Sequence, residues 1–502
     1  MSLVVNISRR MIRQQLFWLS RRLYSESRVP IVKKSNKRVS QVLRKRIDVQ
    51  TTPRIEPGPR TFEPFPYAIT EENKHVVIRR VVEPLYEVPY EEQLASKEQF
   101  CRNSLRHLAQ EIYRSGTPVR LDVRRLPCQV NPIVRSEKIT EYRSADEFSI
   151  WYGLDGKTPT VGYYAFPISK HGNTVSIDPS ECVTSKKEVK TLCQVLQEFV
   201  EHHAKSICFE LGSDGGWRRF KVKINQDNEL MLVGILNPTN FRVREVVEER
   251  DKFKDFVVAR CKEAGLKLVS LYYQPCPRHS CPHKEVPYEL LHGQKTLLDT
   301  IGKYKYVVSP ETNMHTNNSE FQDAIIRTMI EAFELNRSKA KPLIIDVKCG
   351  AGVLAMGLSE VADKVVGVDY RAQAVDDAIE NVKLNKIGNC EFVCSEIEIV
   401  LERILERYAP HNDEIIVICD VSKRGLHQFT MQSLRDCSQV KKIIFITPKV
   451  DAPGVAKNLT TLCSKGKSKS LPPFAPVLAT PVDAYPQTEL CQMILALERL
   501  DR

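Results

Sequence analysis

A short glycine-containing loop, Asp-Val-Lys-Cys-Gly-Ala-Gly, follows an apolar run in the C-terminal half of the chain. Its acid is Asp346, and Asp369 and Asp420 end the second and fourth of the short apolar runs in this region. Glycines let a backbone approach a ligand closely, and open α/β sheets bind nucleotides at the carboxyl ends of their strands. We therefore expect a nucleoside-binding site formed by Asp346, Gly350, Gly352, Asp369 and Asp420.

Two kinds of nucleotide fit this loop. Read as Gly-x-Gly-x-x-Ala with Asp369 downstream, it matches a dinucleotide fingerprint. A dinucleotide would place its pyrophosphate over the turn, where the carboxylate of Asp346 repels it. S-adenosylmethionine (SAM) instead presents an ammonium group to Asp346 and ribose hydroxyls to Asp369, with Asp420 near the methyl group. The loop favours SAM, while helix capping remains the structural alternative for Asp346 and Asp369.

The elements around this loop alternate between short strands and helices, the pattern of a doubly wound parallel sheet. Two late strands joined by Pro486-Gln487-Thr488 complete seven, the usual core of SAM-dependent methyltransferases. The predicted strands cover residues 343–347, 364–369, 390–394, 414–420, 441–447, 482–485 and 491–498. The expected fold is α/β: a C-terminal Rossmann-like class I SAM methyltransferase domain, residues 311–502, preceded by an α+β domain, residues 89–310.

Positive charge is concentrated at the N-terminus. The net charge is +12, yet residues 1–50 hold thirteen Lys and Arg against two acids. Residues 1–25 contain five arginines among apolar residues and no acid, which predicts a mitochondrial transit peptide; an RNA-binding tail is the alternative. Residues 26–88 form a basic Pro-rich linker. Fifteen cysteines without a disulfide-like spacing fit the reducing mitochondrial matrix, the expected location.

The sequence predicts neither a zinc site nor a membrane span. Cys276, His279, Cys281 and His283 are residue types that bind zinc, but their spacing is tight and interrupted by prolines, so a surface loop and no metal site is predicted. No run of apolar residues is long enough to span a bilayer, and no membrane partner is expected.

Five segments together identify a family. In register from about residue 89 to 500, they resemble the tRNA (uracil-5-)-methyltransferase family, with its mitochondrial animal branch the most similar. The resemblance implies an RNA partner, a mitochondrial tRNA with its T-loop uridine or an rRNA, and no DNA. It also makes the central domain the part that grips RNA. The segments are Tyr142-Arg143, residues 155–162, residues 346–352, residues 424–427 and Pro486-Gln487-Thr488.

The family's chemistry needs two groups that this sequence lacks. A cysteine thiolate adds to uracil C6, and a carboxylate later removes the proton from C5. By the resemblance, the cysteine's position is Pro448 and the base's position is Gln492. Proline carries no nucleophile, and an amide does not accept a proton near neutral pH. A SAM-contacting glutamine of the family is replaced by His315, which stays among the cofactor-binding candidates.

Three hypotheses follow for function. The favoured one is a catalytically impaired family member that binds tRNA and SAM. The second is an active 5-methyluridine methyltransferase with a relocated nucleophile, Cys419 or Cys491, although side-chain alternation points Cys419 away from Asp420. The third methylates a base nitrogen or ribose oxygen. Candidate RNA contacts are Arg143, Lys465, Lys467 and the basic arm at 33–46, with simple solvation as the alternative for the lysines.

Overall fold

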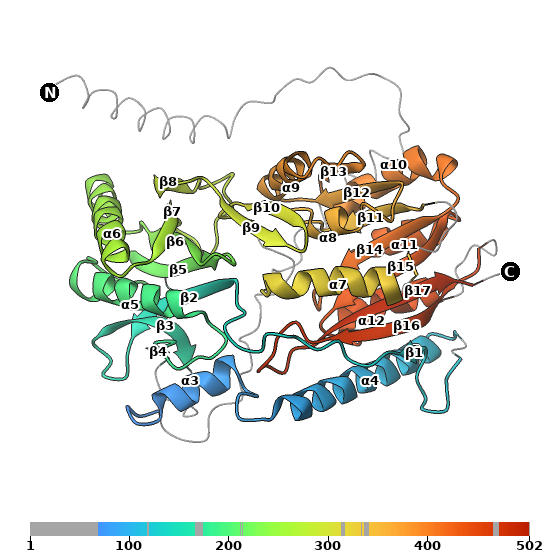
Figure 1. Ribbon diagram of the computed structural model, residues 1–502, viewed down its shortest axis with the longest axis horizontal. Helices are drawn as coiled ribbons and strands as arrows, with labels where there is room; N and C mark the ends of the chain where they lie inside the picture. The colour runs from blue at the N-terminus through green and yellow to red at the C-terminus, as the bar shows by residue number, and fades with distance from the viewer. Residues whose placement is uncertain are drawn as a thin grey trace, which may run out of the picture. The chain divides into compact units, whose positions relative to one another are not determined.

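The computed structural model in Figure 1 describes residues 69–500 except 118–119, 166–173, 211, 213, 313–316, 333, 336–340 and 465–470. The residues that it describes belong to one unit, Phe62–Arg502. The predicted transit peptide, the basic arm and most of the predicted linker lie outside them, as do His315, Lys465 and Lys467. Every helix in the described part of the chain is too short or too polar to cross a bilayer.

An eight-stranded sheet organises the C-terminal half of the chain (Figure 1), in the order β1-β16-β17-β15-β14-β11-β12-β13. Neighbours are parallel except around β17, which runs antiparallel to both β15 and β16. The doubly wound sheet with a late hairpin is thus confirmed, with β1 added at one edge. The strands are β1 (Gln129–Val130), β11 (Leu343–Val347), β12 (Lys364–Asp369), β13 (Cys390–Cys394), β14 (Ile415–Asp420), β15 (Val440–Thr447), β16 (Phe474–Val482) and β17 (Gln492–Arg499).

Helices cover both faces of this sheet because its strands are apolar on both sides. Along β11, Leu343 and Ile345 pack into one hydrophobic cluster and Ile344 into the other. The first cluster includes residues of α4 (Tyr90–Arg114), α10 (Ile397–Tyr408), α11 (Gln428–Asp436) and α12 (Pro453–Cys463). The second includes residues of α7 (Ser319–Ala332), α8 (Val353–Gly357) and α9 (Ala372–Leu384). We call these the α4 face and the α7 face.

The central region is built on a seven-stranded sheet in the order β4-β3-β2-β5-β6-β7-β8. Helices α5 (Lys187–His202) and α6 (Val243–Glu263) pack on it around Phe199, Trp217 and Phe253. The short hairpin β9 (Leu297–Ile301) and β10 (Tyr304–Val308) follows in the chain. The strands are β2 (Ala145–Tyr152), β3 (Pro159–Ala165), β4 (Val175–Ile177), β5 (Gly216–Ile224), β6 (Glu229–Asn237), β7 (Lys267–Pro275) and β8 (Glu289–Gly293).

The N-terminal boundaries differ from those expected. Helix α3 (Lys74–Val82) lies inside the predicted linker 26–88 and buries Val77 and Ile78 against the end of β3 and against β4. Helix α4 starts at the predicted boundary, but it packs on the C-terminal sheet through Leu105 and Leu108. The apolar stripe of a helix indicates that this face is buried, but it does not show which element buries it.

The first strand of the late hairpin also lies elsewhere. We expected it at 482–485, but β16 ends at Val482 and residues 483–491 form the loop that connects it to β17. Pro476 and Pro481 obscured this strand, since proline is rare in sheet interiors. They are tolerated because β16 lies next to the sheet edge, where β1 pairs only with Leu478 and Ala479.

Candidate functional site

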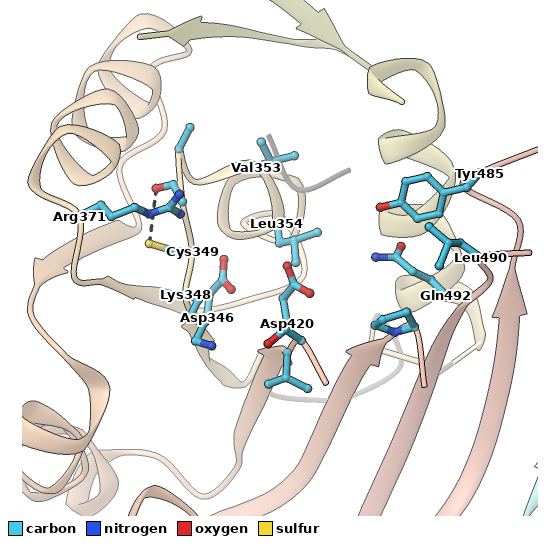
Figure 2. Close-up of a pocket in the computed structure, with 15 residues that line it drawn as sticks. Asp346, Lys348, Cys349, Val353, Leu354, Arg371, Asp420, Tyr485, Leu490 and Gln492 are labelled. Carbon is cyan, nitrogen blue, oxygen red and sulfur yellow. Dashed lines mark hydrogen bonds between the residues drawn. The ribbon is translucent and has the colours of Figure 1, made fainter. Parts of the chain in front are cut away.

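A cavity of about 400 Å³ opens at the carboxyl ends of the central strands (Figure 2). In this view Arg371 flanks it on one side and Tyr485 with Gln492 on the other, with Asp346 and Asp420 between them. The structure therefore brings together several positions named from the sequence. The lining residues are Asp346, Lys348, Cys349, Gly350, Ala351, Val353, Leu354, Arg371, Asp420, Val421, Ser422, Pro448, Tyr485, Leu490 and Gln492.

Strand register explains why Pro448 and Gln492 meet there. In the antiparallel pair β15–β17, Thr447 lies opposite Met493. Extending that register by one residue sets Pro448 opposite Gln492, and facing residues of antiparallel strands have Cα atoms about 5 Å apart. Both side chains line the cavity. The two positions at which the family resemblance expects a nucleophile and a base are therefore neighbours in this fold.

Side-chain alternation decides which residues can face the cavity. Asp420, Pro448 and Gln492 lie two residues from strand positions that belong to the α7 face, and successive side chains of a strand point to opposite faces. Those neighbouring positions are Ile418, Ile446 and Ile494. Cys419 and Cys491 belong instead to the α4 face, where they are 0% and 1% exposed. Neither thiol is among the cavity-lining groups.

The chemistry of the two buried thiols agrees with their placement. Burial raises the pKa of Cys419 well above its ordinary value, and the charge of Asp346 adds to the effect. The pKa of Cys491 is raised by its contact with the Cys101 thiol, at 3.6 Å, and by burial. A thiol with a raised pKa is protonated near neutral pH and is a poor nucleophile. Residues Cys419 and Cys491 do not have the properties of a relocated catalytic cysteine.

We expect this difference to be measurable by alkylation. With iodoacetamide at pH 8 and peptide mapping, Cys419 and Cys491 should react at least about 100-fold more slowly than exposed Cys394. Both should become reactive in urea, which is the control for reagent and detection. Rapid labelling of Cys419 or Cys491 in the native chain would revive the relocated-nucleophile hypothesis.

Asp369 lies at the end of β12 behind the cavity wall, and its carboxylate is fully engaged. Its Oδ1 accepts hydrogen bonds from the backbone N–H of Arg371 at 2.9 Å and from Nε of Arg371 at 3.1 Å. Its Oδ2 accepts from the N–H of Gly350 at 3.0 Å and from an Nη of Arg371 at 3.1 Å. Burial disfavours the guanidinium charge, but the bonds to Asp369 outweigh it and raise the pKa of Arg371.

The two glycines of the loop, Gly350 and Gly352, have different roles. Gly350 and Gly352 have φ values of +56° and +80°, in the left-handed region that favours glycine. A Cβ on Gly352 would meet Phe392 at 3.0 Å and Ala378 at 3.2 Å, so its absence allows close packing. Gly350 faces the cavity. Lys348 also lines the cavity. Its φ of +67° lies in the left-handed region although it is not a glycine.

Helix α4 holds the loop that forms one cavity wall. Lys97 and Asp483 make a buried ion pair with an Nζ–Oδ1 distance of 2.6 Å. Lys97 also donates to the carbonyl of Tyr485 at 3.0 Å. Gln93 and Gln487 exchange hydrogen bonds of 2.8 and 3.0 Å. Since Tyr485 lines the cavity, α4 is part of the site's support, a role that the sequence motif around Pro486 did not reveal.

Arg143 lies away from the cavity. Its Nε is 2.7 Å from Oδ1 of Asp146, and the Arg143 side chain is about one fifth exposed (21%). The neighbouring backbone N–H of Ala145 donates to Oδ1 of Asn317 at 2.7 Å. The segment joins the central region to the chain that leads into α7. The RNA-binding role of Arg143 stays a prediction.

The cysteine–histidine segment is a loop whose residues 277–280 are exposed, as predicted. Cys276 and Cys281 form a disulfide and are buried at 1% and 4% exposure, which the cysteine spacing did not indicate. His279 contacts Glu210 at 2.9 Å, and Nδ1 of His283 accepts from a backbone N–H at 3.0 Å. Among the described residues, no group of three or more His, Cys, Asp or Glu is arranged to hold a metal ion.

Comparisons with known proteins find similarity to a methyltransferase family model and to tRNA (uracil-5-)-methyltransferase homologs. A family model described as ribosomal protein L11 methyltransferase (PrmA) matches residues 327–433. The chain is 28% identical over 423 residues to tRNA (uracil-5-)-methyltransferase homolog B of Danio rerio, covering 83% of this chain and 86% of that protein. It is 27% identical to the Homo sapiens homolog B, covering 84% and 83%.

A solved structure supports the fold. The tRNA (uracil-54, C5)-methyltransferase of Pyrococcus abyssi, in complex with S-adenosyl-L-homocysteine, matches with a TM-score of 0.55 and 18% identity. The match covers 82% of this chain and 84% of that one, so the fold is that of a class I methyltransferase preceded by an α+β region. The resemblance to the tRNA (uracil-5-)-methyltransferase family that the motifs indicated is thereby confirmed over 83% of the chain.

Proposed function

We propose that this protein binds tRNA and SAM as a member of the tRNA (uracil-5-)-methyltransferase family, and that it does not methylate uracil C5. The observation that carries the proposal is the pair Pro448 and Gln492. They occupy facing positions in the cavity at which the family resemblance expects the nucleophile and the base. The composition of the first 25 residues supports a site of action in the mitochondrial matrix.

The residues around the cavity fit SAM. Asp346 is 0% exposed and lines the cavity, so its carboxylate suits a ligand ammonium group. Gly350 opens the backbone on the same side, and Asp369 offers a carboxylate for ribose hydroxyls once Arg371 gives way. The volume of about 400 Å³ lies within the usual range for small-ligand sites. Bound SAM would supply an electrophilic methyl group.

The remaining cavity groups do not replace the missing chemistry at C5. Burial, and then the charge of Asp420, raises the pKa of Tyr485 to about 12, so its hydroxyl stays protonated. Burial raises the pKa of Cys349 well above its ordinary value, and the charge of Asp346 adds to this. Oε1 of Gln492 is buried and accepts no hydrogen bond from the described residues. An amide so placed suits binding of a ligand N–H such as pyrimidine N3–H, and not proton removal.

Methyl transfer to another atom is the second candidate. A base nitrogen or a ribose oxygen is alkylated without addition at C6, so it needs only a proton acceptor near the methyl group. Asp420 lines the cavity and is an ionisable carboxylate. This candidate shares the tRNA and SAM sites with the favoured one and differs only in product.

Titration of the purified full chain tests the proposal. We expect SAM to bind by calorimetry, tRNA to bind with and without SAM, and labelled SAM to leave no 5-methyluridine in the tRNA. Nucleoside analysis of the same tRNA separates the second candidate, because a methylated nitrogen or ribose would be found instead. Formation of 5-methyluridine by the purified chain would contradict the proposal that uracil C5 is not methylated. Failure to bind tRNA would contradict the proposal that the protein binds RNA.

A further inference from the structure

The carboxylate of Asp369 has no capacity left for a ligand in this structure. A carboxylate offers about four lone-pair positions. All four are used by donors at 2.9 to 3.1 Å: the N–H groups of Gly350 and Arg371, and two nitrogens of the Arg371 guanidinium. Two ribose hydroxyls can therefore reach Asp369 only if the guanidinium leaves, because the two backbone donors are fixed.

We propose that Arg371 is a specificity-determining residue that competes with the ribose hydroxyls of an adenosyl ligand for Asp369. The inference rests on the proposed function, since it assumes an adenosyl ligand in this cavity. Arg371 acts as a latch: when it holds Asp369 the ribose site is closed, and when it swings away the site is open. The free energy of breaking the Arg371–Asp369 pair is then subtracted from the affinity of every ligand that needs the diol.

The geometry allows this exchange. The Arg371 side chain is 25% exposed and lines the cavity, whereas that of Asp369 is 0% exposed. Cζ of Arg371 lies 5.9 Å from the ring of Tyr370, which is 57% exposed, so an aromatic face stands beside the route to solvent. The arginine can thus become hydrated while the carboxylate stays in place.

Two ligands and three variants separate the latch from a clamp. The probes are S-adenosylhomocysteine and its 2′,3′-dideoxy counterpart, titrated calorimetrically into the full chain. The variants are Arg371→Ala, Arg371→Lys, which keeps the charge but loses the two-pronged bond, and Arg407→Ala. Arg407→Ala is the matched control, because Arg407 of α10 also forms an ion pair, at 3.2 Å with Glu391 of β13, but does not line the cavity.

We expect Arg371→Ala to bind S-adenosylhomocysteine about tenfold or more tightly, because the two charge-assisted hydrogen bonds from the guanidinium no longer have to be broken. Arg371→Lys should fall between wild type and Arg371→Ala. The dideoxy ligand should change by less than about threefold, and Arg407→Ala should match the wild type with both ligands. Melting curves of all variants report whether each is folded.

The outcomes also separate the latch from the proposed function. If the wild type binds S-adenosylhomocysteine and Arg371→Ala binds it no better, or binds both ligands equally more tightly, the latch is wrong and the cofactor site stands. If Arg371→Ala binds S-adenosylhomocysteine and the wild type does not, the latch is supported, and Arg371 keeps the ribose site closed in the wild type. If neither binds, the latch is wrong and the cofactor half of the proposed function fails with it.

Discussion

The double variant Pro448→Cys/Gln492→Glu is expected to form 5-methyluridine in tRNA from SAM, above a wild-type background of none. The two positions face each other across β15 and β17 and share one cavity, so the restored thiol and carboxylate would work on the same base. The base alone contributes about 10²–10⁴-fold to such reactions, and the thiol supplies the covalent route. Labelled SAM with nucleoside analysis is the measurement.

The single variants divide the two chemical steps. Pro448→Cys alone can add to C6 and support methylation but cannot remove the C5 proton, so a protein–tRNA adduct that survives denaturing gels is expected. Gln492→Glu alone should show neither adduct nor product. The matched control is Leu490→Cys/Gln492→Glu, which places a thiol on the same cavity wall at a position that does not face Gln492. Equal activity of this control and of the Pro448 variant would contradict the prediction, as would a folded double variant that binds both ligands and stays inactive.

The parts of this site that the sequence predicted are those set by local rules. The apolar runs gave β11, β12 and β13 their bounds, because β11 is fully buried, β12 is buried after its first residue, and the half-buried β13 continues the same spacing of short apolar segments. The rule that ligands bind at strand carboxyl ends then placed Asp346 and Asp420 in one cavity. Alternation predicted that Cys419 faces away from it, as the structure has it.

The parts that could not be predicted depend on contacts between distant residues or on a choice among partners. Asp369 was expected to meet ribose, but nothing in the sequence shows that Arg371, two residues later, turns back to bind it. Gln93 and Gln487 hydrogen-bond to each other although they lie 394 positions apart, a contact that no local pattern reveals. A helical stripe does not say which sheet it covers, so α4 was assigned to the central domain and not to the cavity wall that it supports.

Replacing Lys97 by methionine is expected to destabilise the chain by about 3–5 kcal/mol, because it leaves the buried Asp483 without its cation. The two side chains are 2% and 0% exposed, so water does not take over the solvation of the carboxylate. Urea unfolding is the measurement. The matched control on the same helix is Arg114→Ala, whose exposed pair with Glu111 should contribute at most about 1 kcal/mol.

A second substitution shows whether the effect comes from the unpaired charge. Lys97→Met/Asp483→Leu removes both charges and should recover part of the lost stability, because an apolar pair has no desolvation cost. The part-buried hydrogen bond that the Tyr90 hydroxyl donates to Asp483, 3.0 Å long, is lost in that variant and limits the recovery. If Lys97→Met is as stable as the wild type, the ion pair is not what fixes Asp483.

Because Lys97 also donates a hydrogen bond to the Tyr485 carbonyl, its loss should loosen the cavity wall and weaken ligand binding even where the chain stays folded.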